Sequence, residues 1–211
     1  MLPPTIPIFP LPNVVLFPNV FLPLHIFEPR YRAMVADALA GDRIIGMTLL
    51  QSGFEGDYEG RPPVYAIGCA GLITHSEVLP DGRYNIVLRG LERFRIVDED
   101  ASHAYRLAHI EALPDPATDT ARADVGTRRQ RLEAVLAATI ERNGGDARLP
   151  AAIPDGDLVN ALAQYLPLEP LERQALLECH GTAARCDGLI ELLEMHTLSA
   201  DGKTWKDRSI H

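Results

Sequence analysis

The chain of 211 residues is poor in lysine. Its only two lysines, Lys203 and Lys206, fall in the last nine residues, although lysine and arginine together number 20. A Schiff-base or Ser–Lys mechanism would have to take its lysine from this terminal segment, where order is rarest. The sequence also lacks a G-x-x-x-x-G-K-[ST] phosphate loop and a G-x-S-x-G nucleophile elbow. We therefore expect no enzymatic activity.

Cysteines and long apolar runs are also scarce. The three cysteines, Cys69, Cys179 and Cys186, form an odd set without a secretory signal, which indicates reduced thiols in the cytoplasm. Cys179 and Cys186, with the neighbouring His180, match no zinc spacing, so we predict no metal and no other cofactor. Residues 1–12 are apolar but are interrupted by five prolines, and no other run approaches the length of a bilayer. The sequence predicts a cytoplasmic protein without membrane contact.

The formal net charge is -9, and the only basic cluster is Arg89, Arg93 and Arg95. With Tyr84 and Phe94 nearby, these arginines form a candidate stacking surface for single-stranded nucleic acid. The acidic balance favours a different interpretation, in which they lie on a solvated strand face and pair with neighbouring carboxylates. Nucleic acid is thus not the expected partner.

Eight of the 17 prolines lie in residues 1–29. Because proline removes a backbone donor, this apolar stretch predicts extended, edge-like segments and excludes a helix or a central strand. Pro29 suits the first turn of a helix. We expect the preceding Glu28 to accept hydrogen bonds at the helix start and Arg30 to pair with a carboxylate or a carbonyl. On this basis Glu28→Ala should cost about 1 kcal/mol of stability.

The pattern changes twice along the chain. Residues 1–113 contain strand-like runs at 44–50, 65–79, 84–97 and 105–113, and Gly82 lies in a hairpin turn where a positive φ is favoured. After a turn-rich connection, residues 124–198 show helical periodicity, and residues 199–211 form a C-terminal tail. The sequence predicts an α+β protein: a small antiparallel β-barrel over 1–113, followed by a C-terminal α-helical bundle over 124–198.

Two long blocks resemble a known family. IPIFPLPNVVLFPNVFLPL (6–24), followed by HIFEPRYRAMVADAL and RIIGMTLL, is similar to the opening of the substrate-recognition domain of bacterial-type Lon proteases. IGCAGLITHSEVLPDGRYNIVLRGLERFRIVDE (67–99) resembles the family's next signature, and LERQALLE (171–178) and GLIELLE (188–194) resemble its helical end. Within these motifs we expect structural roles for Glu28, Arg30, Tyr31, Gly82, Gly90 and Arg93.

The resemblance implies a PUA-like β-barrel with a helical bundle that recognises substrate polypeptides. The chain ends where the ATPase and protease domains of Lon would begin, so we expect a stand-alone, non-catalytic recognition module. Its expected partners are unfolded or degron-bearing polypeptides, with a Lon-like ATPase or protease as a further candidate. RNA binding by a PUA-like barrel is the alternative, and an enzyme acting on a small molecule in the barrel mouth is a third hypothesis.

The predicted peptide-binding residues lie in the proline-interrupted stretch. Phe17, Phe21, His25 and Phe27 supply more aromatic surface than a loop over a small barrel requires. An extended, proline-rich backbone beside a strand edge also suits docking of another chain. The alternative is that all four side chains point inward and close the barrel.

Overall fold

The structure is a computed structural model that describes residues 1–54, 61–100, 102–115, 119–142 and 153–199. The chain divides into two compact units, Met1–Pro114 and Asp115–His211. The described part of the first unit holds six strands and one helix, and that of the second holds four helices. The protein is therefore of the α+β class.

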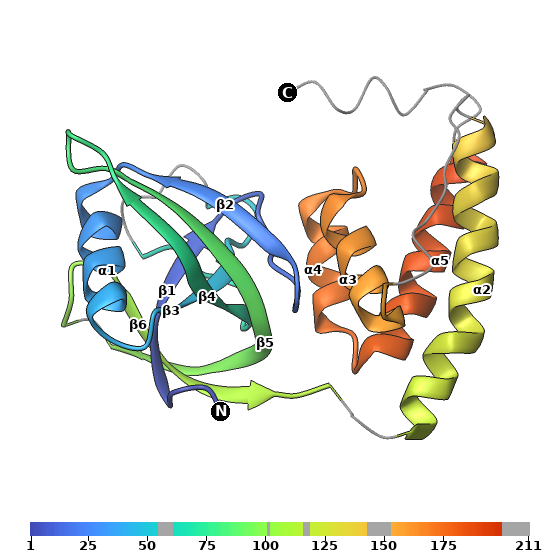
Figure 1. Cartoon of the computed structure of the whole chain (residues 1–211), viewed down its shortest axis with the longest axis horizontal. Coiled ribbons are helices and arrows are strands. Elements are labelled where there is room, and N and C mark those ends of the chain that lie inside the picture. Colours follow the sequence, from blue (N-terminus) through green and yellow to red (C-terminus); the bar gives the residue numbers. More distant parts are fainter. Residues whose placement is uncertain (55–60, 101, 116–118, 143–152, 200–211) are drawn as a thin grey trace. The chain divides into compact units, whose positions relative to one another are not determined.

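The strands of the N-terminal unit form one mixed sheet. They are β1 (Thr5–Leu11), β2 (Phe21–Ile26), β3 (Ile44–Leu49), β4 (Ile67–Val78), β5 (Tyr84–Asp100) and β6 (Arg106–Leu113). Their order is β2-β5-β4-β3-β1-β6, and β5 also pairs with β6. Five strands thus close into a ring of paired neighbours, and Figure 1 shows them curling around a common interior.

Two expectations about the N-terminal strand are wrong. β1 has a neighbour on each side, and its pairing with β3 is parallel rather than antiparallel. The long connection from β1 to β3 makes this possible, since it contains β2 and a helix. β1 pairs with β6 through its first half and with β3 through its second, and the two pairings share only Ile8. Pro7 is therefore paired only with β6 and Pro10 only with β3, so the missing N–H of each proline affects the pairing with one strand.

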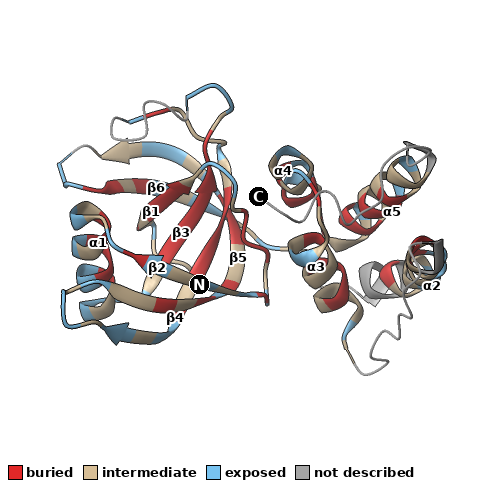
Figure 2. Ribbon diagram, turned by 90° about the horizontal axis from the view of Figure 1, so that it is seen from above, coloured by how far each residue is buried: buried red, intermediate tan, exposed pale blue. Residues whose placement is uncertain are grey.

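The interior of the ring is apolar. Figure 2 shows buried positions concentrated on the strands and on one side of the helix. One buried cluster joins strands that are far apart in the sequence, and it consists of Ile6, Ile8, Ala70, Phe94 and Ala108. Side chains alternate between the two sides of a strand, and on β2 this alternation leaves one side exposed, whereas β3 is buried on both sides from Ile45 to Leu49.

Helix α1 (Pro29–Ala40) begins at the predicted proline and buries Tyr31, Met34, Val35 and Ala38. The Tyr31 ring lies 4.4 Å from the ring of Phe9, which fixes the helix against β1. Glu28 is the N-cap residue, but the expectation that its side chain caps the helix is wrong. The carboxylate instead accepts a hydrogen bond of 3.0 Å from Arg30 Nε, while the Glu28 carbonyl accepts the first helical N–H groups.

This geometry lowers the expected effect of Glu28→Ala. The substitution removes a partly exposed ion pair and no helix cap, so we expect it to cost less than about 1 kcal/mol. A double-mutant cycle with Arg30→Ala, followed by urea denaturation, measures the coupling between the two side chains. A loss well above 1 kcal/mol for Glu28→Ala, with no coupling to Arg30, would contradict the assignment.

The C-terminal unit contains helices α2 (Asp119–Arg142), α3 (Asp155–Tyr165), α4 (Pro170–Glu178) and α5 (Thr182–Ser199). α5 contacts the other three helices. It buries Cys186, Leu189, Ile190 and Leu193, together with the charged side chain of Arg185. No helix in the described part of the chain combines the length and the apolarity needed to cross a membrane.

Candidate functional site

The four predicted binding residues separate into two groups. Phe17 is fully buried, so the expectation that it contacts a guest is wrong. Phe21 and Phe27 are 51% and 60% exposed, and His25 is also exposed. Phe17 differs because its backbone crosses β5 at Gly90, next to the turn at Asn19, and this crossing places the ring in the core.

Strand β2 positions the exposed side chains. It pairs with β5 and lies at the end of the strand order. Along β2, Phe21, Pro23 and His25 are exposed, whereas the intervening Leu22 and Leu24 are half-buried. Successive side chains of a strand point to opposite sides, so the three exposed residues share the outer side of the sheet.

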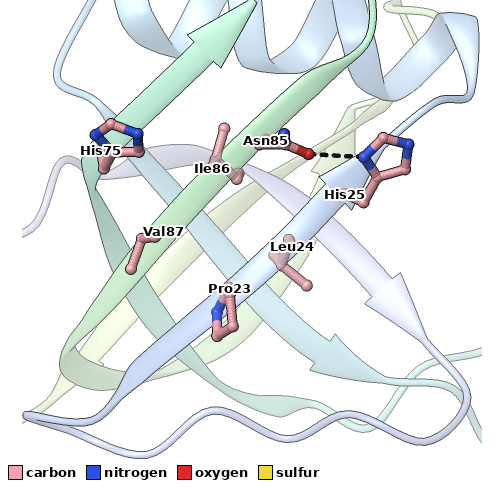
Figure 3. A pocket seen from close by; sticks show the side chains of 7 residues that line it. All are labelled: Pro23, Leu24, His25, His75, Asn85, Ile86 and Val87. Atoms are coloured by element: carbon pink, nitrogen blue, oxygen red, sulfur yellow. Dashed lines mark hydrogen bonds between the residues drawn. The ribbon is translucent and has the colours of Figure 1, made fainter. Parts of the chain in front are cut away.

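The outer side of β2 continues across two further strands. Pro23 pairs with Val87 and His25 pairs with Asn85 on β5, while His75 of β4 pairs with Val87 from the other side. We call this surface the β2–β5–β4 face. It contains an open pocket of about 330 Å³, shown in Figure 3 and lined by Pro23, Leu24, His25, His75, Asn85, Ile86 and Val87.

A chain of hydrogen bonds passes through His25 and Asn85, two of the residues that line this pocket. His25 Nδ1 lies 2.8 Å from Asn85 Oδ1, drawn as the dashed line in Figure 3, and Asn85 Nδ2 donates to Glu77 at 3.0 Å. On the other side of the ring, Arg83 Nη1 lies 3.1 Å from His25 Nε2. Arg83 Nε donates to Asp81 at 2.6 Å. Hydrogen bonds from the Arg83 backbone and side chain lower the pKa of Asp81.

The hairpin turn holds Asp81 and Arg83 in place. Gly82 has a φ of +78°, a conformation that glycine adopts without strain. The turn is closed by hydrogen bonds between Leu79 and Arg83 and from Gly82 to Leu79, each 2.8 Å long. The guanidinium of Arg32 from α1 lies close over Gly82, so a side chain at that position would displace the flexible end of Arg32 in addition to straining the positive φ.

The three arginines of the basic cluster do not share one exposed surface. Arg93 is buried and lies between Cys69 of β4 and Leu113 of β6, so the expected solvated position is wrong for this residue. Arg95 is exposed and pairs with Glu111 at 3.6 Å, and Arg89 donates to Asn19 at 3.4 Å. The register shift in β5 between Gly90 and Glu92 interrupts the simple alternation that the sequence suggests.

The other candidate sites have different chemistry. A smaller pocket of about 140 Å³ contains Asp37 and Asp42, and Asp37 accepts a hydrogen bond from Tyr105 at 2.7 Å. Burial and this contact raise the pKa of Tyr105 to about 12. Burial likewise raises the pKa of Cys186 to about 11.

Within the residues that the structure describes, no three His, Cys, Asp or Glu side chains are arranged to hold a metal ion.

Solved structures of Lon N-terminal domains share this fold. The crystal structure of a Lon N-terminal domain protein from Xanthomonas campestris has a TM-score of 0.61 and 25% identity, and the match covers 89% of this chain and 97% of that one. The N-terminal domain of Mycobacterium avium complex Lon protease has a TM-score of 0.65 at 19% identity, over 91% and 99% of the two chains, which shows the fold alone.

The sequence relatives agree with the fold. The family model of the ATP-dependent protease La (LON) substrate-binding domain matches residues 5–195, and the chain belongs to this family. It is 29% identical over 200 residues to Lon protease 2 of Myxococcus xanthus and 27% identical over 199 residues to Lon protease of Cytophaga hutchinsonii. Each match covers 91% of this chain and 24% of the relative, so the chain spans about a quarter of their length.

Proposed function

We propose that the chain is a non-catalytic module that recognises unfolded polypeptide through the β2–β5–β4 face. The observation that carries this proposal is the position of Phe21 and Phe27 on and just beyond the terminal strand of the sheet, with more than half of each side chain exposed. The open pocket lies between them along β2. Membership in a substrate-binding domain family supports the same function.

The geometry suits an extended guest. β2 exposes every second side chain, so a guest strand running beside it would present its own side chains with the same period. Full burial of a phenylalanine side chain contributes about 1.5–3 kcal/mol, and roughly half of each ring is available here. Two such rings give a weak and reversible contact, which fits a module that samples many unfolded sequences.

Two further features complete the proposal. The closed ring of five paired strands supports a PUA-like barrel, and the contacts of α5 with the other helices support a helical bundle. The relatives are Lon proteases, which supports a Lon-like ATPase or protease as the protein that receives the bound polypeptide. RNA binding is not proposed, because Arg93 is buried away from Arg89 and Arg95.

The test is the double substitution Phe21→Asp and Phe27→Asp. We expect binding to unfolded casein, measured by fluorescence anisotropy, to weaken about tenfold or more, since two apolar contacts are lost and two charges are placed on the face. The thermal midpoint should change little, because more than half of each residue is exposed.

Val97→Asp is the matched control. Val97 is 68% exposed on β5, ten residues along the strand from Val87 of the pocket, so its substitution adds the same charge as either single variant, Phe21→Asp or Phe27→Asp, but outside the proposed site. We expect Val97→Asp to bind casein like the wild type. Equal binding by the double variant and the wild type would place the site elsewhere and overturn the proposal.

A further inference from the structure

We propose that His25 determines the specificity of the pocket: a chain of hydrogen bonds selects the Nδ1–H tautomer of its neutral ring, the pocket then accepts an apolar side chain, and protonation of His25 weakens binding. The proposal about the tautomer stands on the hydrogen bonds alone. The proposal about what enters the pocket rests on the proposed function, and the experiments below separate the two.

The orientation of Asn85 follows from its neighbour on β4. A carboxylate only accepts hydrogen bonds, so Glu77 must face the amide nitrogen of Asn85. The amide oxygen of Asn85 then faces His25 Nδ1 at 2.8 Å. Because that oxygen is an acceptor, Nδ1 must carry a proton and donate it.

The other ring nitrogen is fixed by Arg83. A guanidinium has only donors and stays charged, so His25 Nε2, 3.1 Å from Arg83 Nη1, must be an acceptor. Asp81 holds Arg83 in place through a second hydrogen bond. The chain Glu77–Asn85–His25–Arg83–Asp81 therefore selects the neutral Nδ1–H tautomer of His25.

This arrangement leaves the ring itself as the surface that His25 offers to a guest. Both nitrogens are engaged within the protein, and the ring of Phe27 stacks with a centroid separation of 6.3 Å and an angle of 27°. Pro23 and Val87 line the same pocket. A volume of about 330 Å³ lies at the small end of ligand sites, which suits one large apolar side chain of a guest polypeptide.

Protonation of His25 would conflict with the hydrogen bonds that favour its Nδ1–H tautomer. Protonated His25 has donors on both nitrogens, so its Nε2–H would point at the donor and the like charge of Arg83. The nearby carboxylates do not relieve this, because Asp81 is bound to Arg83 and Glu77 reaches His25 only through Asn85. Other charged or titratable groups nearby are His75, which lines the other side of the pocket, Arg32, which lies over Gly82, and Tyr84, which pairs with Ile26 beside His25. The protonated ring is thus expected to leave its position on the rim.

The tautomer is measured directly by ¹⁵N–¹H correlation spectroscopy of the imidazole in the 211-residue chain at pH 8. The signal of His25 is assigned by its disappearance in His25→Gln. We expect this signal to show a protonated Nδ1 and an unprotonated Nε2. Asn85→Leu should weaken the preference for this tautomer, and its combination with Arg83→Gln should remove it, because neither ring nitrogen then faces a partner that requires one role. A wild-type ring with Nε2–H, or one that is already an imidazolium at this pH, would overturn the hydrogen-bond chain.

The pocket is tested with three fluorescein-labelled decapeptides that differ at one central residue: leucine, aspartate or lysine. We expect the leucine peptide to bind most tightly at pH 8 and to lose about three- to fivefold in affinity at pH 5.5, the range of an exposed charge contact. His75→Gln should keep this loss. Arg83→Gln should abolish it, since a glutamine oxygen can accept a hydrogen bond from protonated His25.

Three results would overturn the specificity. They are a preference for the aspartate or lysine peptide, an equal loss on acidification in wild type and Arg83→Gln, and a loss that disappears in His75→Gln. If none of the peptides binds at either pH, the proposed function and the specificity fail together. The tautomer measurement then still tests whether the hydrogen-bond chain selects the Nδ1–H form, because that measurement needs no bound polypeptide.

Discussion

Arg185→Ala is expected to lower the free energy of unfolding of the helical unit by about 3–5 kcal/mol, the usual cost of removing one partner from a buried charged network. The Arg185 side chain is fully buried in α5. Its Nη1 donates to Asn160 at 2.6 Å and to Asp115 at 3.2 Å, and its Nε donates to the carbonyl of Leu176 at 3.2 Å. Replacement by alanine removes the donor that these three acceptors share, and it also leaves a cavity where the side chain was buried.

Urea denaturation followed by far-UV circular dichroism measures this loss, because the helical unit supplies most of the helix. Arg131→Ala is the control, since Arg131 pairs with Glu194 at 3.0 Å on the surface and its removal should cost less than about 1 kcal/mol. Arg185→Lys should recover only part of the stability, because a single ammonium cannot reproduce the planar fork. Similar losses for the alanine variants of Arg185 and Arg131 would contradict the buried network.

Gly90→Ala is expected to destabilise the N-terminal unit by about 3 kcal/mol, the upper end for adding a methyl group to a packed site. A Cβ at Gly90 would overlap the carbonyl oxygen of Phe17 and lie 2.8 Å from its carbonyl carbon. These are backbone atoms, and the segment that follows them is tied to β5 by hydrogen bonds of 2.9 Å from Asn19 N–H to the Gly90 carbonyl and 2.8 Å from Gly90 N–H to the Val20 carbonyl. The crossing segment would have to move, and β2 directly follows it.

Thermal and urea unfolding of Gly90→Ala are compared with those of Gly41→Ala. A Cβ at Gly41 would have its nearest neighbour at 3.6 Å, which is an ordinary contact, so that variant should stay within about 0.5 kcal/mol of the wild type. Because β2 carries Phe21 and leads directly to Phe27, we also expect Gly90→Ala to bind unfolded casein less tightly. Wild-type stability in Gly90→Ala would show that the close crossing is not a constraint on the fold.

Local patterns in the sequence were sufficient for much of the fold. The apolar stripe of α1, the runs that became β3 to β6 and the turn at Gly82 all follow from periodicity or from one residue's conformational preference. The place of β1 does not follow from such patterns. Its two prolines argue against a strand with two neighbours, and only the switch of partners at Ile8 reconciles them with the sheet.

The candidate site depends on strand pairings that cannot be derived from local sequence patterns. Phe17 and Phe21 are both apolar aromatics four residues apart, and their opposite burial follows from the crossing at Gly90. His75 reaches the pocket because a register shift between Ile73 and His75 places it opposite Val87. Asn85 and Arg83 became relevant only through the pairing of β2 with β5, which joins segments about sixty residues apart.

The most direct test of polypeptide recognition at the β2–β5–β4 face is a ¹⁵N–¹H titration of the labelled protein with unfolded casein. The proposed function predicts that the largest changes occur at β2 (Phe21–Ile26), at Phe27 and at residues 85–89 of β5, and that they vanish in the Phe21→Asp, Phe27→Asp variant. Changes confined to α2–α5, or identical changes in the variant and the wild type, would contradict recognition at this face.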